Sequence, residues 1–173
     1  AMDLARVSDR VDIPVSELEE KAEAWIKNIS DHFKDPNGAG FFFTSDDQEV
    51  LIQRPKAIHD QAIPSGVAVA LTVMQVFKSN RELAHQELDL LSGWIEKNPF
   101  GYSELLNSLL QKEVGVLTLT PGFETGLRFH PYVYTSGKIE REPVICQNES
   151  CEKFDEIKVL QKTRLAPFKI GTE

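Results

Sequence analysis

The feature that most constrains the fold is an apolar run of eleven residues, Val67 to Phe77, which reads VAVALTVMQVF. Apolar residues occur all round this run, and a helix of that kind is buried on every side. Its many β-branched residues also allow a strand, but eleven residues is long for one strand. Pro64 and Ser65 precede the run and are typical of a helix start. The run therefore predicts a central helix that other elements cover.

The flanking segments predict the covering helices. Residues 16–34 carry apolar side chains at helical spacing and begin with a capping-box pattern, Ser16 with Glu19. A further helix is expected from Asn80, and the connection before it is so short that the two helices should be antiparallel neighbours. A shorter helix is expected from Tyr102 to Leu110. The fold class is therefore mainly α, built from helical hairpins.

A smaller β component is expected on both sides of the central helices. Residues 41–44 and 50–53 are β-type runs with a turn between them, which predicts a β-hairpin. The three successive phenylalanines at 41–43 imply burial on both faces or a lid over something. Residues 115–173 read as a strand-rich tail with three short strands, in which 152–162 could add a last helical turn. The chain is expected to be a single segment, 1–173, with helical hairpins over about 1–114.

Composition excludes several classes of function. The chain has 27 acidic and 19 basic residues and a formal net charge of -8. This balance argues against a nucleic-acid partner and against docking on anionic lipid. No apolar run approaches the roughly 20 residues of a membrane span, and no signal peptide is visible. We expect a cytoplasmic protein, and because Ala1 precedes Met2, we expect the chain to be one segment of a longer protein.

Motifs for common cofactors and metals are missing. The two cysteines, Cys146 and Cys151, have a C-x4-C spacing that matches neither a redox pair nor a usual zinc half-site. We interpret them as reduced thiols in or beside a strand, although a local disulfide is also compatible. The sequence contains no P-loop, G-x-G-x-x-G, G-x-S-x-G or H-E-x-x-H pattern. It therefore predicts no metal site and no cofactor.

The polar stretch RPKAIHDQAIPSG, residues 54–66, holds most of the candidate functional residues. Arg54 and Lys56 could bind a carboxylate or phosphate. His59 could act as a general acid or base, with Asp60 fixing its tautomer. The alternative is an ordinary polar loop, which the motif taken alone favours.

Three further positions complete the list of candidates. Ser65 and Gly66 stand at the expected helix start, where anions and sugar oxygens are readily bound. Glu124, in the loop PGFETG, could present an acid to a cleft, although such a sequence is more often a turn. His32 lies near the end of the first helix, where its charge would interact favourably with the helix dipole.

Several stretches together resemble a known family. GAGFFFTSDDQEVLIQRPKAIHDQAIPSGVAVAL, residues 38–71, resembles a segment of the thioredoxin-domain-containing, spermatogenesis-associated protein family. VICQNESCEKF, which starts at Val144, resembles the end of that family. The resemblance runs from about Leu18 to about Cys151. The matching positions are Gly40, Phe41, Arg54, Pro55, Lys56, Asp60, Ala62, Pro64, Ser65 and Gly66.

The resemblance implies an architecture. Members of the family carry an N-terminal thioredoxin-like domain, which this chain lacks, followed by an (α/α) toroid similar to N-acylglucosamine 2-epimerase and six-hairpin glycosidases. This chain would be the C-terminal part of the toroid, with residues 67–77 as an inner helix. The cleft of such toroids lies at the N-terminal ends of inner helices, which would place residues 54–65 at its mouth. His59 and Val67 depart from the family pattern, so no family role passes to His59.

Two functions follow as expectations. The first is a carbohydrate-active domain of the epimerase, isomerase or glycosidase-like class. In it, His59, Asp60 and Glu124 would be catalytic and Arg54, Lys56, Ser65 and Gly66 would bind a sugar-like small molecule. The second is a non-catalytic scaffold that binds a ligand or protein. The segment alone is expected to be inactive and to self-associate, because a piece of a toroid exposes apolar surface.

Overall fold

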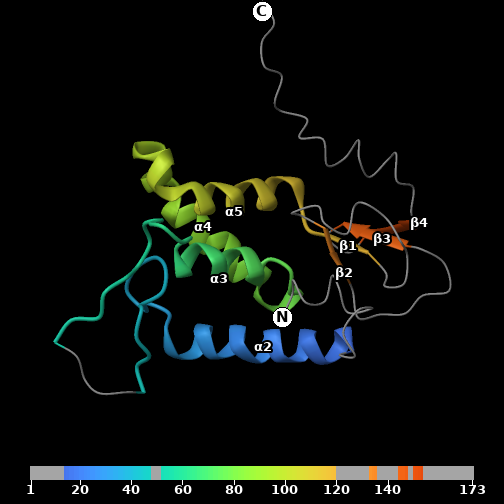
Figure 1. Cartoon of the computed structure of the whole chain (residues 1–173), viewed down its shortest axis with the longest axis horizontal. Helices are drawn as coiled ribbons and strands as arrows, with labels where there is room; N and C mark the ends of the chain where they lie inside the picture. Colours follow the sequence, from blue (N-terminus) through green and yellow to red (C-terminus); the bar gives the residue numbers. More distant parts are fainter. Residues whose placement is uncertain (1–13, 48–51, 120–132, 136–143, 148–149, 154–173) are drawn as a thin grey trace, which may run out of the picture. The chain divides into compact units, whose positions relative to one another are not determined.

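A computed structural model describes residues 14–47, 52–119, 133–135, 144–147 and 150–153 (Figure 1). This part of the chain is mainly helical, with helices α2 (Val15–His32), α3 (Gly66–Met74), α4 (Lys78–Lys97) and α5 (Ser103–Val114) and the 3-10 helix η2 (Pro99–Tyr102). By its internal contacts the chain divides into two compact units, residues 22–112 and residues 1–21 with 113–173. All of the candidate residues discussed below that fall in the described part belong to the unit 22–112.

The predicted helices are confirmed with small changes at their ends. α3 begins at Gly66, and its N-cap is Ser65, whose hydroxyl accepts a hydrogen bond from the amide of Ala68 at 3.0 Å. The helix ends at Met74, three residues before Phe77, and α4 begins at Lys78. The short connection between α3 and α4 makes the two helices neighbours, as the sequence predicts.

The core of the unit 22–112 forms around α3, although α3 is not covered on every side. Ala68, Leu71 and Met74 are fully buried, but Val69 is 42% exposed. The prediction of burial all round is therefore wrong at Val69. The physical reason is that α3 packs against α4 and hydrogen-bonds to α5, and these two neighbours cover only part of its circumference.

The loop from Lys34 to Asp47 is held by hydrogen bonds rather than by a regular hairpin. Phe41 forms an isolated antiparallel bridge with Lys34, and the amide of Phe43 donates to the carbonyl of Pro55 at 2.8 Å. No strand occurs among residues 41–44, and residues 50 and 51 of the expected second arm lie outside the described residues. The β-hairpin is therefore not confirmed, because the loop pairs with Lys34 and Pro55 at single points.

Glu87 of α4 anchors the loop from Lys34 to Asp47. Its side chain is buried and forms an ion pair with Lys34, and its other oxygen accepts from the amide of Gly40 at 2.6 Å. Gly40 has a φ of 83°, which favours glycine at this position. One carboxylate thus anchors two points of the loop to the helix.

The tail contains a four-stranded sheet. Its strands are β1 (Leu117–Leu119), β2 (Val133–Thr135), β3 (Val144–Gln147) and β4 (Ser150–Lys153), in the order β2-β1-β3-β4. β1 and β2 are parallel and the other pairs are antiparallel, with Cys146 opposite Cys151 in the register of β3 and β4. Residues 152 and 153 belong to β4, so the helical turn considered for 152–162 is wrong there. The rest of that range lies outside the described residues.

No helix within the described ranges has the length and apolar character needed to cross a bilayer.

Candidate functional site

The positive side chains of the polar stretch hold in place the loop from Lys34 to Asp47, called the Phe-rich loop below. The guanidinium of Arg54 donates to the carbonyls of His32 and Thr44 and lies 4.3 Å from the centre of the Phe42 ring. Lys56 donates to the carbonyl of Ala39 at 2.7 Å and pairs with a neighbouring aspartate, Asp35. The charged groups of Arg54 and Lys56 are thus bonded to backbone carbonyls and, for Lys56, to a carboxylate of the same fold. Both residues stabilise the loop, whatever further role they have.

Asp60 joins the beginnings of two helices. One oxygen accepts from the amide of Ser65, the N-cap of α3, at 2.8 Å. The other accepts from the amide of Glu104 at 2.8 Å and from the hydroxyl of Ser103 at 3.0 Å, both in the first turn of α5. Partial burial acts to raise the pKa of Asp60, but these hydrogen bonds outweigh it, so the pKa lies below its ordinary value. Asp60 therefore stays ionised and caps α5.

His59 lies on the surface against Tyr102. Its Nε2 is 2.8 Å from the hydroxyl of Tyr102, and the two ring centres are 4.2 Å apart. Gly101 passes so close that an added Cβ would lie 2.8 Å from the imidazole. The ring is thus held in one position by its neighbours. The side chain of Asp60 makes its hydrogen bonds to Ser65, Ser103 and Glu104, so it does not fix the tautomer of His59 through any bond found here.

The predicted candidates therefore separate into two groups. Arg54 and Lys56 contact the loop that follows α2, whereas His59 and Asp60 contact the segment from Gly101 to Glu104. Ser65 caps α3, and Glu124 lies outside the described residues. The structure does not bring these side chains together around a common point within the part that it describes.

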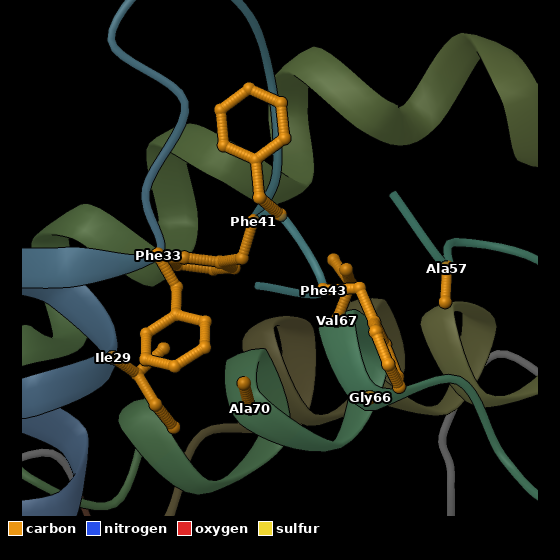
Figure 2. Close-up of a pocket in the computed structure, with 9 residues that line it drawn as sticks. Ile29, Phe33, Phe41, Phe43, Ala57, Gly66, Val67 and Ala70 are labelled. Carbon is orange, nitrogen blue, oxygen red and sulfur yellow. The ribbon is translucent and has the colours of Figure 1, made fainter. Parts of the chain in front are cut away.

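An apolar pocket lies next to the N-terminal half of α3 (Figure 2). Its volume is about 220 Å³, and its lining contains four phenylalanines and no charged side chain. The lining residues are Ile29, Phe33, Phe41, Phe42, Phe43, Ala57, Gly66, Val67 and Ala70. Figure 2 shows Phe33, which directly follows α2, and Phe43 from the loop bordering the space above Val67 and Ala70 of α3.

The phenylalanines of the pocket differ in burial. Phe41 is 3% exposed and belongs to the core, whereas Phe43 is 72% exposed at the mouth of the pocket. Burial of all three successive phenylalanines is therefore not found, and their role as a lid stays a prediction. The pocket can therefore offer flat apolar surfaces to a ligand, but no acid or base from its own lining.

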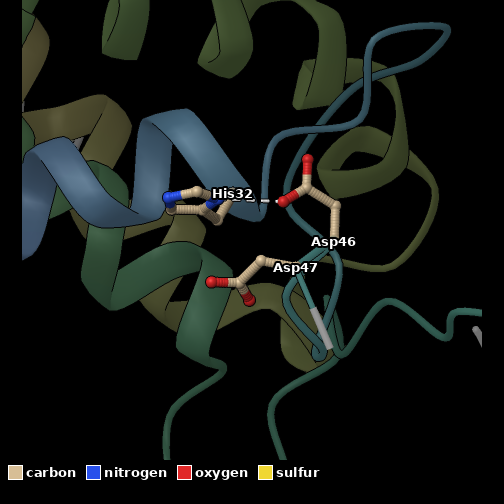
Figure 3. A group of neighbouring side chains, drawn as sticks. All are labelled: His32, Asp46 and Asp47. Carbon is tan, nitrogen blue, oxygen red and sulfur yellow. Dashed lines mark hydrogen bonds and ion pairs between the residues drawn. The ribbon is translucent and has the colours of Figure 1, made fainter. Parts of the chain in front are cut away.

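A second cluster lies at the C-terminal end of α2 (Figure 3). His32, Asp46 and Asp47 each offer a ligand atom, and these atoms lie within 4.8 Å of one another. Nδ1 of His32 is 2.9 Å from Oδ1 of Asp46. The hydrogen bond to Asp46 raises the pKa of His32, with further contributions from the charges of Asp47 and Asp31.

This second cluster and the aromatic pocket were missed by sequence reasoning. The sequence pattern predicts His32 only as a helix-end residue, and Asp46 and Asp47 only as turn residues. A signal was present, because two adjacent aspartates begin 14 residues after the histidine that ends the helix. The sequence alone does not show that the loop folds back onto that helix.

Comparison with known proteins adds no relative: no family model, curated protein or solved structure matches the chain.

Proposed function

We propose that this chain is a ligand-binding scaffold, the C-terminal part of an (α/α) toroid in a thioredoxin-domain-containing protein. The observation that carries the proposal is the aromatic pocket beside the start of α3, in which no charged side chain lines the wall. Its place agrees with the cleft that the family resemblance implies. The polar candidates Arg54, Lys56 and Asp60 are bonded to backbone groups of the fold, which supports binding rather than catalysis.

The ligand class proposed is a single sugar-like ring. The cavity of about 220 Å³ is smaller than the roughly 300–1,000 Å³ of pockets for drug-sized ligands, so it suits one small ring. Phenylalanine faces pack on the C–H faces of a sugar, while the sugar hydroxyls can remain in water at the open mouth. The cations of Arg54 and Lys56 lie 4.3 and 5.2 Å from the centre of the Phe42 ring, which is part of the pocket lining.

A pair of alanine substitutions tests this proposal. Ala57 and Ala62 are both exposed residues of the same loop, but only Ala57 lines the pocket. Glucose, mannose and N-acetylglucosamine are titrated into the chain while backbone amide shifts are followed by NMR. We expect Ala57→Leu to weaken binding about tenfold, a loss of about 1.4 kcal/mol, and Ala62→Leu to leave it unchanged. Equal affinities in the two variants, or no binding by any sugar, would overturn the proposal.

The second candidate function is carbohydrate chemistry, as an isomerase, epimerase or glycosidase-like activity. It is favoured by His59, whose exposed imidazole lies against the hydroxyl of Tyr102 and belongs to the side-chain type used most often in general acid–base catalysis. The full-length protein is assayed for interconversion of free sugars. Activity that disappears in His59→Gln while the melting temperature is unchanged would support catalysis. Absence of activity in the wild-type protein would leave the binding function alone.

A further inference from the structure

His32, Asp46 and Asp47 together have the composition of a metal site. They supply one imidazole nitrogen and two carboxylate oxygens from two segments that are 14 residues apart. Two exposed aspartates alone would not indicate a metal site, because acidic pairs are common on protein surfaces. The imidazole changes the argument, since a nitrogen ligand selects ions such as Zn²⁺ over Mg²⁺ and Ca²⁺.

The spacing of the ligand atoms is compatible with a small ion. With Zn–ligand distances of about 2.0–2.1 Å, neighbouring ligand atoms lie about 3.3 Å apart in a tetrahedral site and about 2.9 Å apart in an octahedral one. Nδ1 of His32 and Oδ1 of Asp46 are 2.9 Å apart, so one edge of the site already has ligand spacing. Asp47 is exposed, accepts a hydrogen bond from the hydroxyl of Ser45, and has its ligand atom within 4.8 Å of those of His32 and Asp46 (Figure 3).

The surrounding backbone holds the two segments together. The carbonyl of His32 accepts from the amide of Asp46 at 3.0 Å and from the guanidinium of Arg54 at 3.0 Å. Asp46 is therefore tied to His32 by backbone and side chain at once. Because the histidine and the loop are already in place, binding an ion requires little ordering of the chain.

The local electrostatic field also favours a cation. His32 is the last residue of the 18-residue helix α2, and the C-terminal end of a helix carries a partial negative charge. With a neutral imidazole, the two carboxylates give the ligand set a charge of about -2, which matches a divalent ion. The guanidinium of Arg54, which lies close by, directs its bonds to the carbonyls of His32 and Thr44. Asp31 adds negative charge nearby and is paired with Lys27.

We propose that His32, Asp46 and Asp47 bind one divalent transition-metal ion of the Zn²⁺ class, with water in the remaining positions. The site lies at the end of α2 and is independent of the sugar-binding function proposed for the aromatic pocket. The bound ion would link the Phe-rich loop to α2 by coordination in place of the His32–Asp46 hydrogen bond.

Isothermal titration of the chain with ZnCl₂ tests the proposal. Cys146→Ser and Cys151→Ser are included in every sample, since thiolates are also zinc ligands. The decisive variant is Asp47→Asn, and its matched control is Asp31→Asn, which removes the same charge at the same helix end without removing a ligand. Loss of an outer-shell partner alone typically costs 10–100-fold in metal affinity, so we expect at least about tenfold weaker binding for Asp47→Asn. We expect Asp31→Asn to change the affinity less than about threefold.

Several outcomes would overturn the proposal. These are no zinc binding by the chain, equal affinities in Asp47→Asn and Asp31→Asn, or displacement of zinc by millimolar Ca²⁺ or Mg²⁺. A second readout separates binding from folding: zinc should raise the melting temperature of the parent chain and of Asp31→Asn, but not that of Asp47→Asn. Circular dichroism confirms that each variant is folded before titration.

Discussion

Asp60 satisfies three donors at the beginnings of two helices with one carboxylate. Helix starts leave amides without intrahelical acceptors, and an acidic side chain there is favoured by the helix dipole as well. The donors come from Ser65 and from Ser103 and Glu104, about 40 residues further along the chain. Asp60 is thus a long-range cap. We expect its removal to lower the free energy of unfolding more than it changes ligand binding.

The first prediction concerns the charge of Asp60. Asp60→Asn keeps one oxygen acceptor but loses the charge and the second acceptor. Hydrogen bonds to charged groups contribute about 1.5–3 kcal/mol, so we expect the free energy of unfolding to fall by about 2 kcal/mol. Urea denaturation measures the change. Asp31→Asn is the control, because the exposed Asp31–Lys27 pair should contribute less than about 1 kcal/mol.

The pH dependence of the same pair of proteins checks the cause. The pKa of Asp60 is lower in the folded chain than in the unfolded chain. The carboxylate therefore stabilises the fold above its unfolded pKa of about 3.9, and this contribution is lost as the pH falls through the folded value. The difference between wild type and Asp60→Asn should narrow at pH values below about 4. A difference that stays constant from neutral to acid pH would mean that the charge is not the source of the stability.

At the scale of elements, polar side chains join α3 and α5. The hydroxyls of Thr72 and Ser108 are 2.7 Å apart, and Gln75 donates to the carbonyl of Ser108 at 3.1 Å. Gln111 returns a bond to the carbonyl of Thr72 at 2.9 Å. Ser108, Gln75 and Gln111 are almost completely buried. Such a seam sets the relative position of two helices, because each polar group needs its own partner.

The second prediction is a double-mutant cycle across this seam. Thr72→Val removes a hydroxyl without changing the shape, and Ser108→Ala removes the other. Each single change leaves part of a buried hydrogen-bond network without its partner. The double variant should therefore lose less stability than the sum of the two single variants, with a coupling of about 1 kcal/mol. Thermal and urea unfolding of the four proteins measure it, and strict additivity would show that the two hydroxyls do not act together.

The elements show where sequence reasoning succeeds and where it stops. The 3.6-residue spacing of apolar side chains predicted α2 and α4, and Pro64 with Ser65 predicted the start of α3. These signals are local. The contacts of Arg54 with His32 and of Asp60 with Glu104 span 22 and 44 residues, and nothing in the local pattern specifies them. The function of the polar stretch depends on these contacts. The sequence alone therefore left two interpretations open, a functional cluster and an ordinary polar loop.

At the scale of the molecule, large apolar side chains remain on the surface. Leu90 is 63% exposed and Trp94 is 47% exposed, and they lie four residues apart on one face of α4. Trp25 of α2 is 62% exposed. An exposed apolar pair on a helix is expected where another helix would cover it in a larger assembly. The toroid proposal accounts for these exposed faces.

The third prediction is that the isolated chain self-associates through such faces. Light scattering should give a dimer or a larger species, because burying these side chains again removes apolar surface from water. Leu90→Glu should shift the equilibrium toward monomer. Ile63→Glu is the control, since Ile63 is also exposed, at 75%, but lies in a loop. A monodisperse wild-type monomer would count against the toroid proposal.

The contacts of Glu87 with the loop limit which substitutions related chains can accept. Its carboxylate serves the ammonium of Lys34 and the amide of Gly40 together, and Gly40 has a backbone conformation that few other residues adopt. If one of these three residues is replaced, a substitution at either of the other two cannot restore the lost bonds. Positions 34, 40 and 87 should therefore change as a set among related chains, and a loop of this shape should not persist where glutamate at 87 is lost.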